Sequence, residues 1–178
     1  AKRDGFVTYP DFPDELKVYS DHVLDIFGQR LNKSEREDIH RYYSYWEIDS
    51  SRKDDKYYLL AHTQGMLPTD NFELLADYCP VKGLSFTSEL CSLTHLSLPA
   101  DTLEEGDLLR WEYDSSNEYD KFAIKVFKGK DYVGRVKRIH SRVFYKKNGQ
   151  RLKITVKSIN RNGHLNRAFI RISFDSFV

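Results

Sequence analysis

The sequence NEYD, at residues 117–120, lies between two segments whose hydrophobicity alternates as it does in β-strands. Proteins that bind single-stranded nucleic acid combine stacking aromatic rings with a positive groove. Tyr119 supplies a ring, and a run of cations follows it: Lys121, Lys125, Arg135, Lys137, Arg138 and Arg142. A structural interpretation competes. Asn117 and Asp120 are typical Asx-turn residues that accept hydrogen bonds from their own backbone, and Tyr119 would then be a core residue.

The charge of the chain is divided very unevenly. Residues 1–120 contain 12 Lys and Arg against 25 Asp and Glu, a net −13, whereas residues 121–178 contain 16 against 2, a net +14. Such asymmetry indicates a basic surface for a polyanionic partner such as nucleic acid. The alternative is that the acidic part simply packs against the basic part, because surface charge also serves solubility.

A second basic segment comes near the end of the chain. Residues 160–167, NRNGHLNR, are predicted to form a long hairpin loop that carries Arg161, His164 and Arg167. A flexible basic loop can contact a phosphate backbone. It can equally be a solvated turn.

The elements that must position these residues follow from periodicity. A helical pattern begins at Val18 and continues to Leu31, and a second helix is predicted from a capping box with Ser34 as N-cap and Glu37 at N3. A third is predicted over residues 57–63. The period then changes to two. Strands are predicted at 85–93, 108–114, 122–127, 131–136, 152–159 and 168–174, with a short basic helix at 138–149 ended by Gly149.

This order predicts an α+β protein, with an acidic helical region at residues 1–80 and an antiparallel β-domain with one short helix at residues 81–178. With 40% hydrophobic residues, a packed core is expected. No segment is long and apolar enough for a membrane span, no secretory signal is visible, and two cysteines are too few for a disulfide scaffold. These features predict a cytoplasmic protein.

Other chemistry has little support. Cys79, Cys91 and His95 lack the fourth ligand that a zinc site requires. His62 has no nucleophile or orienting group in a recognisable arrangement. The acidic stretch 101–107 could be imagined as a nuclease metal site, but it is more simply a polar turn before a strand. We therefore expect neither an enzyme nor a cofactor.

Residues 106–140 resemble the HIRAN domain. The resemblance rests on Asn117, Tyr119, Asp120, Ala123, Ile124, Val126, Val133, Gly134 and Arg135. Residues 12–31 and 61–74 are similar to one bacterial subgroup of these proteins that has a HipA-like N-terminal region. Members of that subgroup begin with a further strand-rich segment, so the resemblance implies a fragment, a processed chain or a short member.

The resemblance implies a small OB-like β-barrel that reads single-stranded DNA ends and captures the 3′ hydroxyl. Tyr119 would stack on a base and Asp120 would accept a hydrogen bond from that hydroxyl, while Arg135 and Arg138 would contact the strand. The predicted function is therefore a nucleic-acid-binding module. The alternative is a protein-interaction or regulatory module that binds another chain. The candidate nucleic-acid-binding residues are Tyr119, Asp120, Lys121, Arg135, Lys137, Arg138, Arg142 and Arg161.

Overall fold

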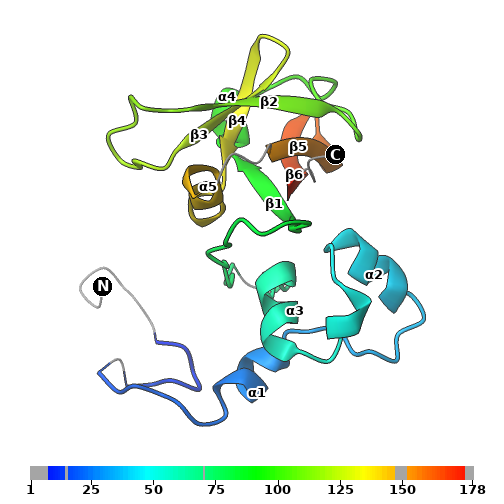
Figure 1. Ribbon diagram of the computed structural model, residues 1–178, viewed down its shortest axis with the longest axis vertical. Coiled ribbons are helices and arrows are strands. Elements are labelled where there is room, and N and C mark those ends of the chain that lie inside the picture. The colour runs from blue at the N-terminus through cyan, green and yellow to red at the C-terminus, as the bar shows by residue number, and fades with distance from the viewer. Residues whose placement is uncertain (1–7, 15, 70, 147–151, 175–178) are drawn as a thin grey trace.

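The computed structural model describes residues 8–14, 16–69, 71–146 and 152–174. Short helices come first and a six-stranded antiparallel β-barrel follows, so the predicted α+β class is confirmed. Figure 1 shows the barrel above and the helices of the N-terminal half below, joined by the extended segment that precedes β1. Within the described part of the chain, no helix is long and apolar enough to cross a membrane.

The helical region contains α1 (Val23–Gly28), α2 (Ile39–Tyr45), a 3₁₀ turn at Ser50–Arg52 and α3 (Lys56–Thr63). The third predicted helix is confirmed, but the capping box at Ser34 is wrong. Helix α2 begins at Ile39 after Asp38. The Arg36 guanidinium binds the carboxylate of Asp38 and the amide of Asn32, which holds this segment in consecutive turns. The first helix also starts later than its pattern indicated, at Val23.

The barrel closes in the order β1-β4-β3-β2-β5-β6, and every neighbouring pair is antiparallel. Its strands are β1 (Ser85–Cys91), β2 (Leu108–Tyr113), β3 (Ile124–Lys128), β4 (Asp131–Val136), β5 (Leu152–Asn162) and β6 (His164–Phe174). A one-turn helix, α4 (Leu93–Leu96), follows β1. Helix α5 (Arg138–Tyr145) follows β4 and starts where the sequence indicated, although Gly149, its predicted end, lies outside the described residues.

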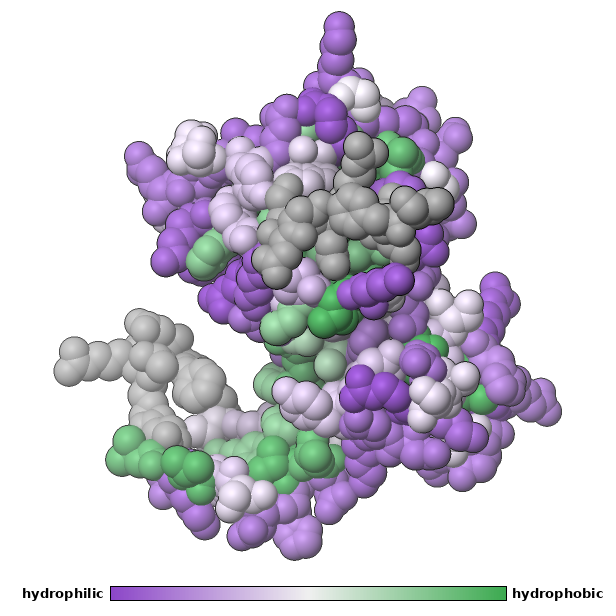
Figure 2. All heavy atoms as spheres, viewed as in Figure 1, coloured by the Kyte–Doolittle hydropathy of each residue, from purple (hydrophilic) through white to green (hydrophobic). Residues whose placement is uncertain are grey.

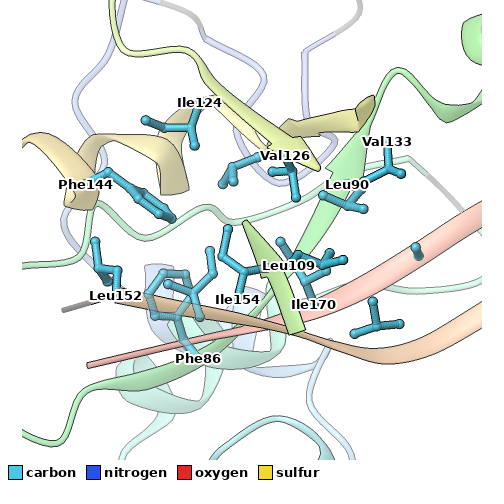
Figure 3. Close-up of a cluster of buried hydrophobic side chains, with 14 of the residues drawn as sticks. Phe86, Leu90, Leu109, Ile124, Val126, Val133, Phe144, Leu152, Ile154 and Ile170 are labelled. Atoms are coloured by element: carbon cyan, nitrogen blue, oxygen red, sulfur yellow. The ribbon is translucent and has the colours of Figure 1, made fainter. Parts of the chain in front are cut away.

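Alternating residues of the strands fill the inside of the barrel. Ile124, Val126, Val133, Ile154 and Ile170 are almost completely buried and converge in Figure 3. Each such side chain contributes about 1.5–3 kcal/mol when it is removed from water. Helix α5 adds Phe144 to the same cluster. Because this core fixes the ends of β2, β3 and α5, it also fixes the surface that those elements share.

The predicted long loop at residues 160–167 is wrong. Strands β5 and β6 stay paired as far as Asn162 and His164, and Gly163 alone makes the turn, with a φ of 71°. Leu165 is buried, and its N–H donates to the carbonyl of Leu98. Burial and strand pairing therefore extend both strands beyond the segments in which their hydrophobicity alternates. Arg161 is a strand residue here.

Two helix ends join the helical region to the barrel. Glu47 follows α2 and Gln64 follows α3, and both adopt a left-handed backbone (φ 56° and 59°) that normally favours glycine. In both cases the side chain crosses to the barrel. Glu47 accepts hydrogen bonds from Ser85 and Lys157, and the Gln64 amide donates to the Thr87 carbonyl at 3.1 Å. These bonds give a physical reason for non-glycine residues at both positions.

Candidate nucleic-acid interface

The connection between β2 and β3, residues 114–123, has a backbone held by side-chain hydrogen bonds. The Oδ1 atom of Asn117 accepts from the N–H groups of Tyr119 at 3.0 Å and Asp120 at 2.9 Å. The Oδ1 atom of Asp120 accepts from the N–H of Phe122 at 3.0 Å. The Asx-turn interpretation is therefore confirmed for both residues. The idea of Tyr119 as a core residue is wrong, because 90% of it is exposed.

Asp114 lies beneath this loop and organises it. Only 1% of its side chain is exposed. One oxygen accepts from Ser116 and pairs with the Lys125 ammonium at 2.9 Å, and the other accepts from Nε and Nη2 of Arg135 at 3.0 and 2.8 Å. Burial acts to raise the pKa of Asp114, but the hydrogen bonds from Lys125 and Arg135 outweigh it and hold that pKa well below its usual range.

Sequence reasoning missed Asp114. In the predicted strand 108–114 it alternates in the same set as Arg110 and Glu112, which are exposed. The strand ends at Tyr113, and the chain then turns Asp114 inward toward cations on β3 and β4. An acidic residue directly before an Asn-containing turn was the available signal.

The exposed face of the loop combines a ring, a carboxylate and cations. The partly buried carboxylate of Asp120 has its Oδ1 atom 3.9 Å from Nε of Arg138, the first residue of α5. Arg138 is largely exposed, and so are Tyr119 and Lys121. Figure 1 shows this loop projecting from the barrel on the side of α5. The structure thus brings together four of the candidate residues.

An aromatic cluster that the sequence interpretation did not include adjoins this loop. The ring of Phe122 lies 5.2 Å from that of Tyr145 at the end of α5, and Tyr145 lies 4.7 Å from Tyr113. The sequence places Tyr113 and Phe122 in two separate predicted strands, at 108–114 and 122–127. Only the packing of α5 against the β2–β3 loop brings these rings together.

The other candidate cations have partners within the protein. Lys137, with 12% of its side chain exposed, pairs with Glu73 at 2.7 Å and Glu89 at 3.4 Å. Arg142 pairs with Asp77 at 3.5 Å. Arg161 donates to the carbonyls of Ala100 and Leu103.

Arg161 also lies away from the loop. It is seven residues beyond Ile154, the β5 partner of Leu109, in the direction opposite to the end of β2 that leads into the loop. The structure therefore does not bring Arg161 together with Tyr119 and Asp120.

Ion pairs neutralise much of the basic segment. Carboxylates of residues 47–120 pair with the following cations: Lys125, Lys128, Arg135, Lys137, Arg138, Arg142, Lys146, Lys157 and Arg167. These contacts support the interpretation that the acidic part packs against the basic part. The positive charge available to a ligand is consequently smaller than the composition indicated.

Gly134 has a structural role. Its φ is 131°, and a Cβ atom added there would lie 2.6 Å from the carbonyl oxygen of Cys91 on β1. The close approach that this glycine permits is therefore between β4 and β1.

Two histidines are buried between the helices and the barrel. His140 binds the Ser88 hydroxyl through Nδ1 at 2.8 Å, and burial first, with the charge of Lys137 second, lowers its pKa to about 3. Burial also lowers the pKa of His62, whose Nδ1 lies 3.3 Å from the carbonyl oxygen of Trp46. Among residues 8–14, 16–69, 71–146 and 152–174, no group of three or more potential metal ligands is found.

No protein-family model and no curated protein matches this chain. Two solved structures are distantly similar. The HIRAN domain of human HLTF is 19% identical, with a TM-score of 0.41, over 51% of this chain and 74% of that one. A structural-genomics target from Lactobacillus plantarum is 23% identical, with a TM-score of 0.39, over 52% of this chain and 95% of the other. Neither similarity is close enough to assign a function, and neither extends support to the HipA-like bacterial subgroup.

Proposed function

We propose that the β2–β3 loop and the start of α5 form a nucleic-acid-binding surface for single-stranded DNA, with a preference for strand ends. The observation that carries this proposal is Tyr119. Its ring is 90% exposed, yet the loop beneath it is fixed by hydrogen bonds from backbone N–H groups to Asn117 and Asp120. A ring presented on an ordered loop stacks on a base without a large loss of conformational entropy.

The neighbouring groups supply the remaining chemistry. Stacking of one base on an aromatic ring is worth about 1–3 kcal/mol. Asp120 uses Oδ1 for the turn, and its second oxygen accepts a hydrogen bond from a ligand hydroxyl in this proposal. That role is the one that the resemblance of N-x-Y-D to the HIRAN domain implies for the aspartate. Lys121 and Arg138 provide the positive charge for phosphate.

We limit the proposed set of contacts by the exposure and the ion pairs of each residue. Tyr119, Asp120, Lys121 and Arg138 form its centre, since the partner of Arg138 is Asp120 itself and 70% of the Arg138 side chain is exposed. Arg135 and Arg142 lie at the border, because Asp114 and Asp77 pair with them. We leave out Lys137 and Arg161, whose donors already have internal partners. With two or three phosphates contacted, the slope of log K against log salt is expected to be about −1.4 to −2.

The test is a fluorescence-anisotropy titration at about 50 and 200 mM salt. The ligands are single strands with a free 3′ hydroxyl, single strands with a 3′ phosphate, and a blunt duplex. Asp120→Asn keeps an oxygen that can form the Asx turn but removes the charge, and Tyr119→Leu removes the ring. Tyr57→Leu is the matched control, because Tyr57 is an exposed tyrosine on α3 in the helical region.

We expect the free hydroxyl to bind best, Asp120→Asn to remove that preference, and Tyr119→Leu to weaken every single strand. Equal binding of all three ligands would reject end recognition and leave general phosphate binding. Absence of binding, or an affinity independent of salt, would reject the proposed function.

A protein-interaction role is the second candidate, and the helical region favours it. Leu16 and Val18 are 90% and 89% exposed, and an apolar groove between α1 and α3 is lined by Phe27, Leu60 and Leu74. Figure 2 shows hydrophobic residues gathered over α1 and the segment before it, whereas the visible face of the barrel is mainly hydrophilic. Stoichiometric co-elution with another protein, without retention of DNA, would support this role.

A further inference from the structure

A strip of aromatic rings leads from the β2–β3 loop to the end of α5. Phe122 and Tyr145 meet edge to face, with ring centroids 5.2 Å apart, and 38% of Tyr145 is exposed. Tyr113 supports Tyr145 from β2 at 4.7 Å. Contacts of this kind stabilise aromatic pairs beyond the area that they bury.

Hydrogen bonds hold two of these rings in place. The Tyr145 hydroxyl donates to the carbonyl of Ala123 at 3.3 Å, and the Tyr113 hydroxyl donates to the carbonyl of Phe144 at 3.1 Å. Burial first, and the neighbouring Tyr113 and Asp120 next, raise the pKa of Tyr145, so its hydroxyl remains a donor at neutral pH. The bond to Ala123 and the contact with Phe122 place Tyr145 beside the loop.

Cations accompany the strip. The Lys121 ammonium lies 5.1 Å from the centre of the Phe122 ring, and the Arg142 guanidinium lies 5.6 Å from it. Exposed aromatic residues that occur singly need no explanation. A contiguous set of aromatic rings bordered by cations is typical of surfaces that bind single-stranded nucleic acid.

Distance along the chain limits how far this strip lies from Tyr119. Phe122 is three residues beyond Tyr119, so their Cα atoms are at most about 10 Å apart. Phe122 and Tyr145 are in contact, so both rings lie close enough to Tyr119 for one single strand to reach them from it.

We propose that Phe122 and Tyr145 form a second stacking position, which takes the base next to the terminal one in a single DNA strand. This inference rests on the proposed function and adds a subsite to it. The terminal nucleotide engages Tyr119 and Asp120, and its neighbour stacks on the exposed part of Tyr145. Lys121 and Arg142 face the phosphate between the two nucleotides.

The experiment compares oligonucleotides that carry one abasic residue at the second, third or sixth position from the preferred end. Each is titrated by anisotropy against the wild-type chain, Tyr145→Leu and Tyr145→Phe, with Tyr57→Leu as the control. Circular dichroism checks that each variant is folded. Should Tyr145→Leu not fold, the abasic series on the wild-type chain still tests the proposal, because the absence of a penalty specific to the second position would overturn it.

For the wild-type chain we expect an abasic residue at the second position to weaken binding about 5- to 100-fold, and one at the sixth position to have little effect. Tyr145→Leu is expected to weaken the intact strand by a similar factor and to remove the abasic penalty, whereas Tyr145→Phe keeps both. Equal abasic penalties at all positions, or an unchanged penalty in Tyr145→Leu, would overturn the second stacking position while Tyr119→Leu still tests the first. No binding by the wild-type chain would reject both proposals.

Discussion

Replacement of Asp114 by Asn should destabilise the protein by about 3 kcal/mol. The buried carboxylate accepts charge-assisted hydrogen bonds from Lys125 and Arg135. Breaking a buried ion pair by removing one partner costs about 3–5 kcal/mol. Because about one third of each cationic side chain is exposed, water compensates part of the loss, and the lower end of that range applies. The amide would also face donors with an NH₂ group that cannot accept from them.

The assay is urea denaturation of wild type, Asp114→Asn and Glu112→Gln. The transition midpoint of Asp114→Asn should fall without a change in slope. Glu112 is an exposed partner of Arg110 on the same strand, and its replacement should cost less than about 0.5 kcal/mol. Asp114→Asn should also weaken DNA binding, since Asp114 lies beneath the loop that presents Tyr119.

The pH dependence provides an independent check. The pKa of Asp114 is lower in the folded protein than its ordinary value of 3.8, so its stabilising contribution is complete above about pH 4 and is lost as the pH falls below that value. The stability difference between wild type and Asp114→Asn should be constant from pH 7 to pH 5 and should shrink below pH 4. A difference under 0.5 kcal/mol at pH 7, or one that persists unchanged at pH 2.5, would refute this account.

Three further predictions concern other sites. Asp77→Asn removes the ion-pair partner of Arg142 and Lys146 beside the proposed interface, so it should tighten single-strand binding and steepen the slope of log K against log salt by about 0.7 to 1.4. An unchanged slope in anisotropy titrations would argue against this prediction. The pKa of His140 is about 3 in the folded protein, below its ordinary 6.5, so its contribution should lower the free energy of unfolding by about 1.4 kcal/mol per pH unit as the pH falls below 6.5. In urea titrations at pH 5.5 and 4.5, His140→Gln should not show this part of the decline. Gly134→Ala should lower the free energy of unfolding by about 3 kcal/mol because its Cβ atom clashes with Cys91, whereas Gly129→Ala, with open space around it and a φ of 60°, should lower it by about 1 kcal/mol. Equal shifts of the melting temperature would show that the clash is relieved.

The sequence by itself determined the order of the helices and strands, the approximate positions of the strands, and the Asx turn at Asn117. Hydrophobic alternation is a local property, and it placed β1, β2, β4 and the start of α5 close to their observed bounds. The Asx turn at Asn117 was also predictable, because its donors are two and three residues away. Local patterns failed where another part of the chain supplied the partner. The capping box at Ser34 yielded to the bonds of Arg36, and the loop at 160–167 became paired strands around the buried Leu165.

Only the tertiary structure decided which charges remain available. Lys137 belongs to the basic segment, but Glu73, 64 residues earlier in the chain, neutralises it. Asp114 continues the exposed side of β2 in the sequence, yet the barrel turns it toward Lys125 and Arg135. Ion pairing depends on distances of a few ångströms between segments that are remote in sequence, and no periodicity encodes those distances. The composition therefore predicted a basic surface, and the fold paired much of that charge while it left Lys121 and Arg138 exposed beside Tyr119.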